Sequence, residues 1–245
     1  MPLWDPNTRK LSDFTARFSL TIGTVGSGTS DFGDGLAFFL APKGFIIPPN
    51  TVGGGLGLLN ITNYFSAQNQ IVLVEFDSNV NNEWDPPLAH VGINSNSIAS
   101  VTYTRWNTSF HSGDTVDVWI IYNATTKNLS VSWTYQNTTN TQENTSLSYQ
   151  IDLMEVLPER VTVGFSAATG VRIERNSIQS WEFSSSLDIK ETTGKEAEYI
   201  SLIVELAVVG LIIIVFVMLW IWKGNKKVTA EIVNVTSIHD DLREE

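Results

Sequence analysis

Cysteine is absent from this sequence of 245 residues, which excludes a disulfide framework, a zinc–thiolate site and a thiol nucleophile. Positive charge is scarce, since 15 Lys and Arg stand against 26 Asp and Glu and the formal net charge is −11. This argues against nucleic acid as a partner, because phosphate binding needs a basic surface. The motif G-x-S-x-G is missing and there are three histidines, so nothing supports a Ser–His–Asp hydrolase.

Glycosylation sequons of the form N-x-[ST] are frequent. Six of them precede the apolar segment near the C-terminus, with acceptors at Asn60, Asn107, Asn123, Asn128, Asn137 and Asn144. Such a density indicates passage through the secretory pathway and a glycoprotein. Turn chemistry alone is the alternative, because Asn, Ser and Thr are common in loops.

One long apolar run, Ile200–Trp222, is long enough to cross the hydrocarbon core of a membrane as a helix. Its one charged residue, Glu205, lies in the second turn, where it either reaches the headgroups or marks a helix–helix contact. Tyr199 precedes the run, and Trp220 and Trp222 end it, as aromatic residues at a membrane interface do. We predict a single transmembrane helix.

Charge on either side of this run sets its orientation. Lys223, Lys226 and Lys227 follow it directly, whereas acidic residues outnumber lysines before it. The positive-inside rule then predicts a type I single-pass protein of the plasma membrane. Its parts are an extracellular domain over 1–187, a stalk over 188–199, the transmembrane helix over 200–222 and a cytoplasmic juxtamembrane tail over 223–245.

The extracellular part reads as all-β. Short β-rich runs, separated by Gly, Asn, Ser and Pro clusters, recur along it, and no stretch before residue 190 has sustained helical periodicity. The runs are Phe18–Ile22, Leu36–Leu40, Ile71–Phe76, Val116–Tyr122, Leu129–Tyr135, Val161–Phe165 and Trp181–Phe183. Many strands with turn punctuation predict a sandwich or jelly roll.

Side chains of the types that bind metal ions, here called ligand-type side chains, lie at the end of one of these runs and in the loop that follows it. Glu75 and Asp77 are two apart on a strand and share a face, so they repel unless a cation or a proton lies between them. Oxygen ligands suit calcium, and carboxylates with one imidazole suit a transition ion such as manganese. A polar turn with solvated acids and a surface histidine is the alternative. The loop supplies, in order, Asn79, Asn81, Asp85 and His90.

Two other kinds of site can be tested by counting the positions of their motifs. An EF-hand loop counted from Asp77 needs Gly and Glu where Asn82 and Leu88 stand, so that interpretation fails. A laminarinase-type glycosidase needs Glu-x-Asp-x-x-Glu, and its third acid is replaced by Val80. We therefore predict a protein without enzymatic activity.

The segment from Val72 to Ile93 resembles the metal-binding loop of legume lectins. Three further blocks resemble that family in its own order along the chain. They are Gly33–Pro42, like the strand and turn with the sugar-binding aspartate; Gly53–Leu58, like the glycine-rich sugar loop; and Gly164–Gly170 with Ser180–Phe183, like the specificity loop and last strand. The resemblance implies a legume-lectin jelly roll of two packed antiparallel sheets.

The resemblance also implies roles for individual residues. Manganese would be held by Glu75, Asp77, Asp85 and His90, and calcium by Asp77, Asp85, Asn81 and the carbonyl of Asn79. The sugar would be bound by Asp34, Asn81 and a backbone N–H of Gly54 or Gly55, with Val171 and Arg172 in the specificity loop. The Gly33–Asp34 peptide would be cis. Mannose- or glucose-type glycans are the implied ligands.

Two features depart from the family pattern. An aromatic ring that stacks on the sugar usually stands where this chain has Asn79, so affinity falls unless Trp84 or another nearby aromatic replaces that ring. The match also begins part-way into the domain, so the early strands and a signal peptide are expected to be missing. A fragment, a splice form or a partial gene model would account for this.

The overall plan resembles plant lectin receptor kinases without the kinase. Leu3–Pro6 resembles the end of the missing N-terminal region, and Thr236–Leu242 the start of the juxtamembrane segment. Three functions stay open: a membrane lectin for glycans or glycoproteins, an ectodomain with an impaired sugar site that binds a peptide, hydrophobic molecule or receptor, and a kinase-less regulator. The last would pair with full-length lectin receptor kinases or self-associate.

Overall fold

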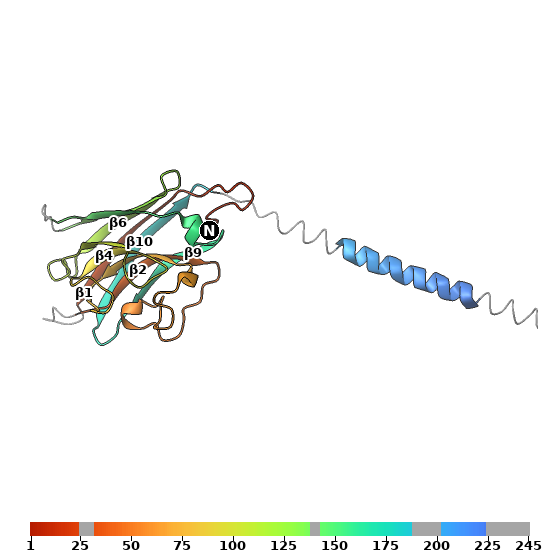
Figure 1. The fold of residues 1–245 in the computed structure, drawn as a ribbon, viewed down its shortest axis with the longest axis horizontal. Coiled ribbons are helices and arrows are strands. Elements are labelled where there is room, and N and C mark those ends of the chain that lie inside the picture. Colours follow the sequence, from red (N-terminus) through yellow and green to blue (C-terminus); the bar gives the residue numbers. More distant parts are fainter. Residues whose placement is uncertain (25–31, 138–142, 188–201, 224–245) are drawn as a thin grey trace, which may run out of the picture. The chain divides into compact units, whose positions relative to one another are not determined.

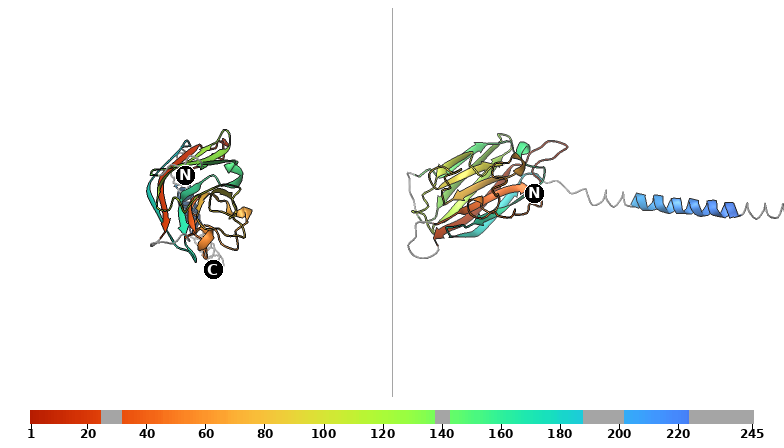
Figure 2. Two further views of the ribbon diagram at one scale, coloured as in Figure 1. Left: turned by 90° about the vertical axis from the view of Figure 1, so that its left-hand side faces the viewer. Right: turned by 60° about the horizontal axis from the view of Figure 1, so that its bottom comes forward.

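The computed structural model describes residues 1–24, 32–137, 143–187 and 202–223. The chain divides into two units, Met1–Ile189 and Lys190–Glu245. The first is a sandwich of two antiparallel sheets (Figures 1 and 2). The all-β prediction is confirmed.

The first sheet, here called the back sheet, has the strand order β10-β1-β6-β7-β8. β6 explains how it packs: its side chains alternate, and Val116, Val118, Ile120 and Tyr122 are buried while the residues between them are not. Its strands are β1 (Phe14–Thr24), β6 (Thr115–Asn123), β7 (Asn128–Tyr135), β8 (Ser146–Gln150) and β10 (Glu174–Ser185).

The second sheet, here called the front sheet, has the order β5-β4-β3-β2-β9 and carries the site discussed below. Its strands are β2 (Gly35–Pro42), β3 (Val72–Asp77), β4 (His90–Ser95), β5 (Thr102–Arg105) and β9 (Val161–Ala168). Short helical turns lie at η1 (Gly53–Gly55), η2 (Ala67–Asn69) and α1 (Leu153–Val156).

β3 is buried along its whole length because both faces of the front sheet are covered. Val72, Val74 and Phe76 enter the main core between the sheets. Leu73 points the other way, into a second apolar cluster with Leu56 and other residues of the 56–59 loop. Burying each large apolar side chain contributes about 1.5–3 kcal/mol, so this loop is held firmly against the sheet.

Aromatic rings join the two sheets in the main core. Phe18 of β1 lies 6.2 Å from Phe38 of β2 and 4.9 Å from Phe165 of β9, measured between ring centroids. Phe76 contacts Trp106 and Trp133 edge-on. These contacts fix the front sheet on the back sheet and thereby the strand ends that carry the ligand-type side chains.

The second unit contains an apolar helix, Leu202–Lys223, that is long enough to cross a membrane. Its bounds agree with the predicted run to within two residues at the N-terminal end and one at the C-terminal end. Glu205, Trp220 and Trp222 are exposed on it. The predicted stalk, Tyr199, Lys226, Lys227 and the rest of the tail lie outside the described residues.

Candidate functional site

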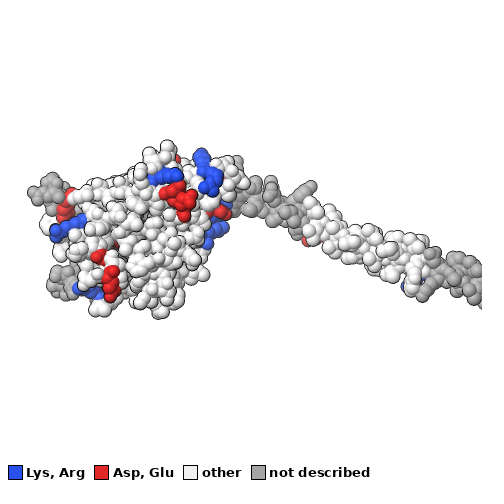
Figure 3. Space-filling model, in the orientation of Figure 1, with Lys and Arg blue, Asp and Glu red and all other residues white. Residues whose placement is uncertain are grey.

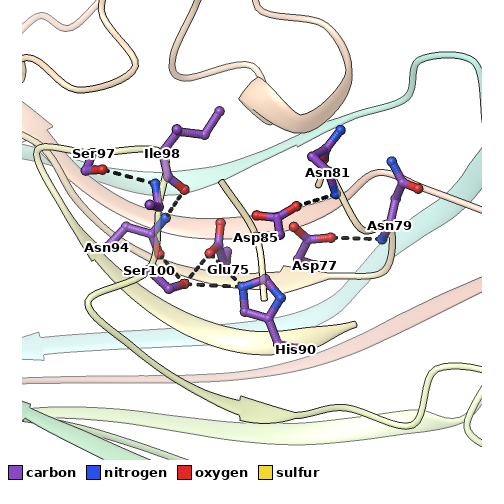
Figure 4. Close-up of polar contacts among 11 residues, drawn as sticks. Glu75, Asp77, Asn79, Asn81, Asp85, His90, Asn94, Ser97, Ile98 and Ser100 are labelled. Atoms are coloured by element: carbon purple, nitrogen blue, oxygen red, sulfur yellow. Dashed lines mark hydrogen bonds and ion pairs between the residues drawn. The ribbon is translucent and has the colours of Figure 1, made fainter. Parts of the chain in front are cut away.

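The ligand-type side chains meet at one end of the front sheet, where β3 ends and β4 begins (Figure 4). Glu75 and Asp77 lie on the same face of β3, and both are buried. Antiparallel pairing sets Asp77 opposite His90, the first residue of β4. The connecting loop returns Asp85 to the same place, where Asp77, Asp85 and His90 each offer a ligand atom within 4.8 Å of the others.

Glu75 completes the group. Its Oε1 lies 3.2 Å from Nε2 of His90. Two polar atoms of this region, Asn81 Oδ1 and His90 Nδ1, are buried without a hydrogen-bond partner in the described structure. Three carboxylates, an imidazole and an orphaned amide oxygen are a donor set that fits calcium and manganese side by side.

The acids themselves shape the loop. The backbone N–H of Asn79 donates to Asp77 Oδ1 at 2.8 Å, and that of Asn81 donates to Asp85 Oδ2 at 2.7 Å. Each carboxylate therefore orders the loop through one oxygen. The same contacts bring the Asn79 carbonyl and the Asn81 amide into the neighbourhood of the acids.

Burial and mutual repulsion raise the pKa values of two of these acids. Burial raises the pKa of Asp77 well above its ordinary value, and the charges of Glu75 and Asp85 raise it further. Burial also raises the pKa of Asp85, to about 6, against the hydrogen bond from Asn81. A group with such shifts needs protons or cations to compensate the buried negative charge.

The Asp85 shift predicts a pH dependence for the metal-free protein. The pKa of Asp85 is about 6 in the folded state against 3.8 for an unperturbed group, so the folded state binds the proton more tightly. The stabilisation that comes from protonated Asp85 is fully present below pH 3.8 and is lost as pH rises through about 6. In EDTA, we expect the melting temperature to fall between pH 4 and pH 7 in calorimetry. Asp85→Asn should flatten that slope, and an unchanged slope would contradict the assignment.

Ser100 belongs to the group and was missed from sequence. Its Oγ donates to Glu75 Oε1 at 2.5 Å and lies 3.3 Å from His90 Nε2 and 3.1 Å from Asn94 Oδ1. Ser100 stands in a Ser- and Asn-rich turn that resembles any other turn in the chain. Only the pairing of β3, β4 and β5 brings it to Glu75, so no local signal would have found it.

A pocket of about 790 Å³ opens beside the acidic group. The peptide Gly33–Asp34 is cis, as the resemblance implied, and Asp34 is 4% exposed at the pocket. The loops after β2, β3 and β9 provide the remaining lining. The predicted sugar residues found among the lining residues are Asp34, Gly54, Asn81, Val171 and Arg172.

Gly55, the other candidate for the glycine-loop N–H, is buried beside Tyr64 and is not a lining residue of this pocket. Gly54 lies close against the loop between β3 and β4. A Cβ at Gly54 would stand 2.6 Å from Oδ1 of Asn81 and 3.0 Å from the Trp84 ring, so only glycine allows this approach. The geometry favours Gly54 as the donor.

Trp84 does not supply the missing ring. Its ring lies 5.1 Å from that of Tyr64 and packs against the second apolar cluster, and it is not among the pocket-lining residues. At the family's aromatic position, the Asn79 Nδ2 donates to Asp34 Oδ1 at 2.9 Å. The Trp84 ring therefore packs the loop, and affinity is expected to fall unless another nearby aromatic replaces the stacking ring.

The six sequon asparagines all lie on the described sandwich. Asn123, Asn137 and Asn144 are exposed, and Asn60, Asn107 and Asn128 are partly buried. Thr138 and Thr139 of the Asn137 sequon lie outside the described residues. On the face drawn in Figure 3, Lys and Arg are interspersed with Asp and Glu and form no continuous basic area among the residues coloured there.

Residues 1–199 match the legume lectin domain. The chain belongs to the legume lectin family. It is 46% identical over 249 residues to L-type lectin-domain containing receptor kinase IX.1 of Arabidopsis thaliana, covering 99% of this chain and 38% of the kinase. The chain thus spans well under half of that relative.

Solved structures agree with the fold. Lectin II from Ulex europaeus matches with a TM-score of 0.70 at 37% identity, covering 76% of this chain and 78% of that one. Lectin I from Ulex europaeus, in complex with the methyl glycoside of α-L-fucose, matches with a TM-score of 0.67 at 34% identity, covering 76% of each chain. The predicted legume-lectin fold is confirmed. The family is non-enzymatic and its members generally bind calcium and manganese.

Proposed function

We propose that this chain is a single-pass membrane lectin that binds glycans or glycoproteins outside the plasma membrane. One observation carries the proposal: Asp34, Gly54 and Asn81 line a single pocket that adjoins the buried acids. The apolar helix and the similarity to a receptor kinase support the membrane anchor. In this proposal residues 1–187 form the lectin domain, 188–199 the stalk and 223–245 the cytoplasmic tail.

The proposed metal roles are those that the resemblance to legume lectins implies. Glu75, Asp77, Asp85 and His90 would hold manganese, and Asp77, Asp85, Asn81 and the Asn79 carbonyl would hold calcium. Bound cations neutralise the buried acids and fix the loop, so that sugar binding need not order it. The unpartnered Asn81 Oδ1 and the raised pKa values of Asp77 and Asp85 support this set.

Recognition rests on the chain's own polar atoms. If the Asn81 oxygen binds calcium, its amide nitrogen would be left to donate to a sugar hydroxyl. Asp34 Oδ2, buried and without a partner in the described structure, accepts hydroxyl donors, and the Gly54 N–H donates to a hydroxyl oxygen. Hydrogen bonds to the charged aspartate are the strongest of these. Mannose- and glucose-type glycans are the first ligands to test.

A second function has its own observation. Asn79 both removes the stacking ring and occupies one oxygen of Asp34. An ectodomain with such an impaired sugar site would bind a peptide, a hydrophobic molecule or a partner receptor, and would act as a kinase-less regulator. Sugar competition separates the two functions, because only the lectin releases its partner when a sugar is added.

The deciding experiment measures oligomannose binding by the full chain in detergent with calcium and manganese. Asp34→Asn should weaken binding about 100-fold or more, because hydrogen bonds to a charged group contribute about 1.5–3 kcal/mol each and two hydroxyls are involved. Glu182→Gln, which makes the same charge change at an exposed position on β10, should bind like the wild type. Equal binding by the Asp34 variant and the control would overturn the assignment of the pocket.

A further inference from the structure

The pocket beside the loop between β3 and β4 contains a positively charged side chain as well as an acidic one. Among its described lining residues, Asp34 and Arg172 are the charged ones, and Arg172 comes from the turn between β9 and β10. Burial raises the pKa of Asp34, and the hydrogen bond from Asn79 and the charge of the Arg172 guanidinium lower it only in part. Arginine stays charged at any physiological pH, so the pocket keeps a permanent positive charge near Asp34.

Asn79 connects the two charged groups. Arg172 Nη1 donates to Oδ1 of Asn79, and Nδ2 of Asn79 donates to Oδ1 of Asp34 at 2.9 Å. One carboxamide with a hydrogen bond on each side therefore spaces the guanidinium from the carboxylate, a separation of about 7–8 Å at most. The two groups are therefore close enough for a single residue of a glycan to reach both.

The chemistry at the two ends is different. Oδ2 of Asp34 is buried without a partner in the described structure and accepts hydroxyl hydrogens. The guanidinium has five N–H donors in a planar fork whose shape matches a carboxylate. It can serve Asn79 and a ligand carboxylate together. A ligand with hydroxyl groups at one end of a ring and a carboxylate at the other complements both.

We propose that the preferred ligand of this pocket is an acidic saccharide, a glycan that carries a hexuronic acid. Its carboxylate binds Arg172 and its hydroxyl groups bind Asp34. This inference rests on the proposed lectin function and names its ligand class. It also accounts for Asn79, since a charged contact compensates for the stacking ring that this position lacks.

The experiment compares two matched sugar pairs on the full chain in detergent: the methyl glycosides of glucuronic acid and glucose, and those of galacturonic acid and galactose. The protein is loaded with calcium and manganese and then freed of excess metal, because uronates bind calcium themselves. By calorimetry we expect the acid of one pair to bind about tenfold more tightly than its neutral partner. Arg172→Gln should reduce that ratio to about one, and Arg175→Gln, an exposed arginine on β10 outside the pocket lining, should preserve it.

Each other outcome has a definite meaning. Equal binding of acid and neutral sugar by the wild type overturns the acidic-ligand inference but leaves a working lectin. Equal weakening of both sugars by Arg172→Gln also overturns it, because Arg172 then only positions Asn79. If no sugar of any kind, oligomannose included, binds to a chain whose melting temperature still rises with metal, the proposed lectin function itself fails.

Discussion

Replacing Asp77 with Asn is expected to change stability in opposite directions with and without metal. Without metal, the variant should melt at a higher temperature than the wild type, because burial and the charges of Glu75 and Asp85 make an ionised Asp77 unfavourable. With calcium and manganese the wild type should gain about 2.7 kcal/mol at a metal concentration 100 times its dissociation constant, and the variant should gain little. That gain corresponds to about 5–10 °C for a domain of this size.

Scanning calorimetry of the full chain at pH 7, in EDTA and then with both metals, measures the effect. Glu182→Gln on β10 is the matched control, because it removes one negative charge at an exposed position and should leave the metal-induced rise intact. A metal-induced rise that survives Asp77→Asn would show that the cations bind elsewhere. A large loss of stability in EDTA would show that the Asp77 carboxylate is held by contacts other than a cation.

The sandwich could be predicted from the sequence because its central strands carry strong signals. β6 alternates buried and solvent-facing residues, and β3, which is covered on both faces, begins with the apolar run Val72–Val74. β8, an edge strand whose residues alternate between exposed and half-buried positions, was not predicted from the sequence. At such an edge the sequence is too polar to distinguish a strand from a turn.

The candidate metal group was predictable for a similar reason. Glu75, Asp77, Asp85 and His90 lie within one segment, and strand periodicity alone places the first two on one face. Contacts between distant segments were not predictable. Ser100 reaches Glu75 through sheet pairing, and Arg172 reaches Asn79 from a turn 93 residues away. The position of the Trp84 ring was not predictable for the same reason, since it depends on Tyr64 and the loop that Trp84 packs against.

Gly35 is a position where a single methyl group should be strongly destabilising. It directly follows the cis peptide and Asp34, and it pairs with Asp77 across the strands β2 and β3. Its φ is 144°, which side-chain-bearing residues rarely adopt, and a Cβ there would lie 2.4 Å from the carbonyl oxygen of Phe76. Because that obstacle is backbone, Gly35→Ala must push apart the two strands that position Asp34 and Asp77.

We expect Gly35→Ala to cost about 3 kcal/mol of stability, the combined effect of backbone strain and overlap, which lowers the melting temperature of the metal-loaded chain by about 10 °C. Sugar binding should fall with it, since Asp34 and Asp77 move relative to one another. Gly164→Ala is the control, because a Cβ there meets the Phe39 ring at 3.4 Å, an ordinary contact on the same sheet. If the two variants have the same melting temperature and bind sugar equally well, the tight approach of β2 to β3 is not what aligns Asp34 with Asp77.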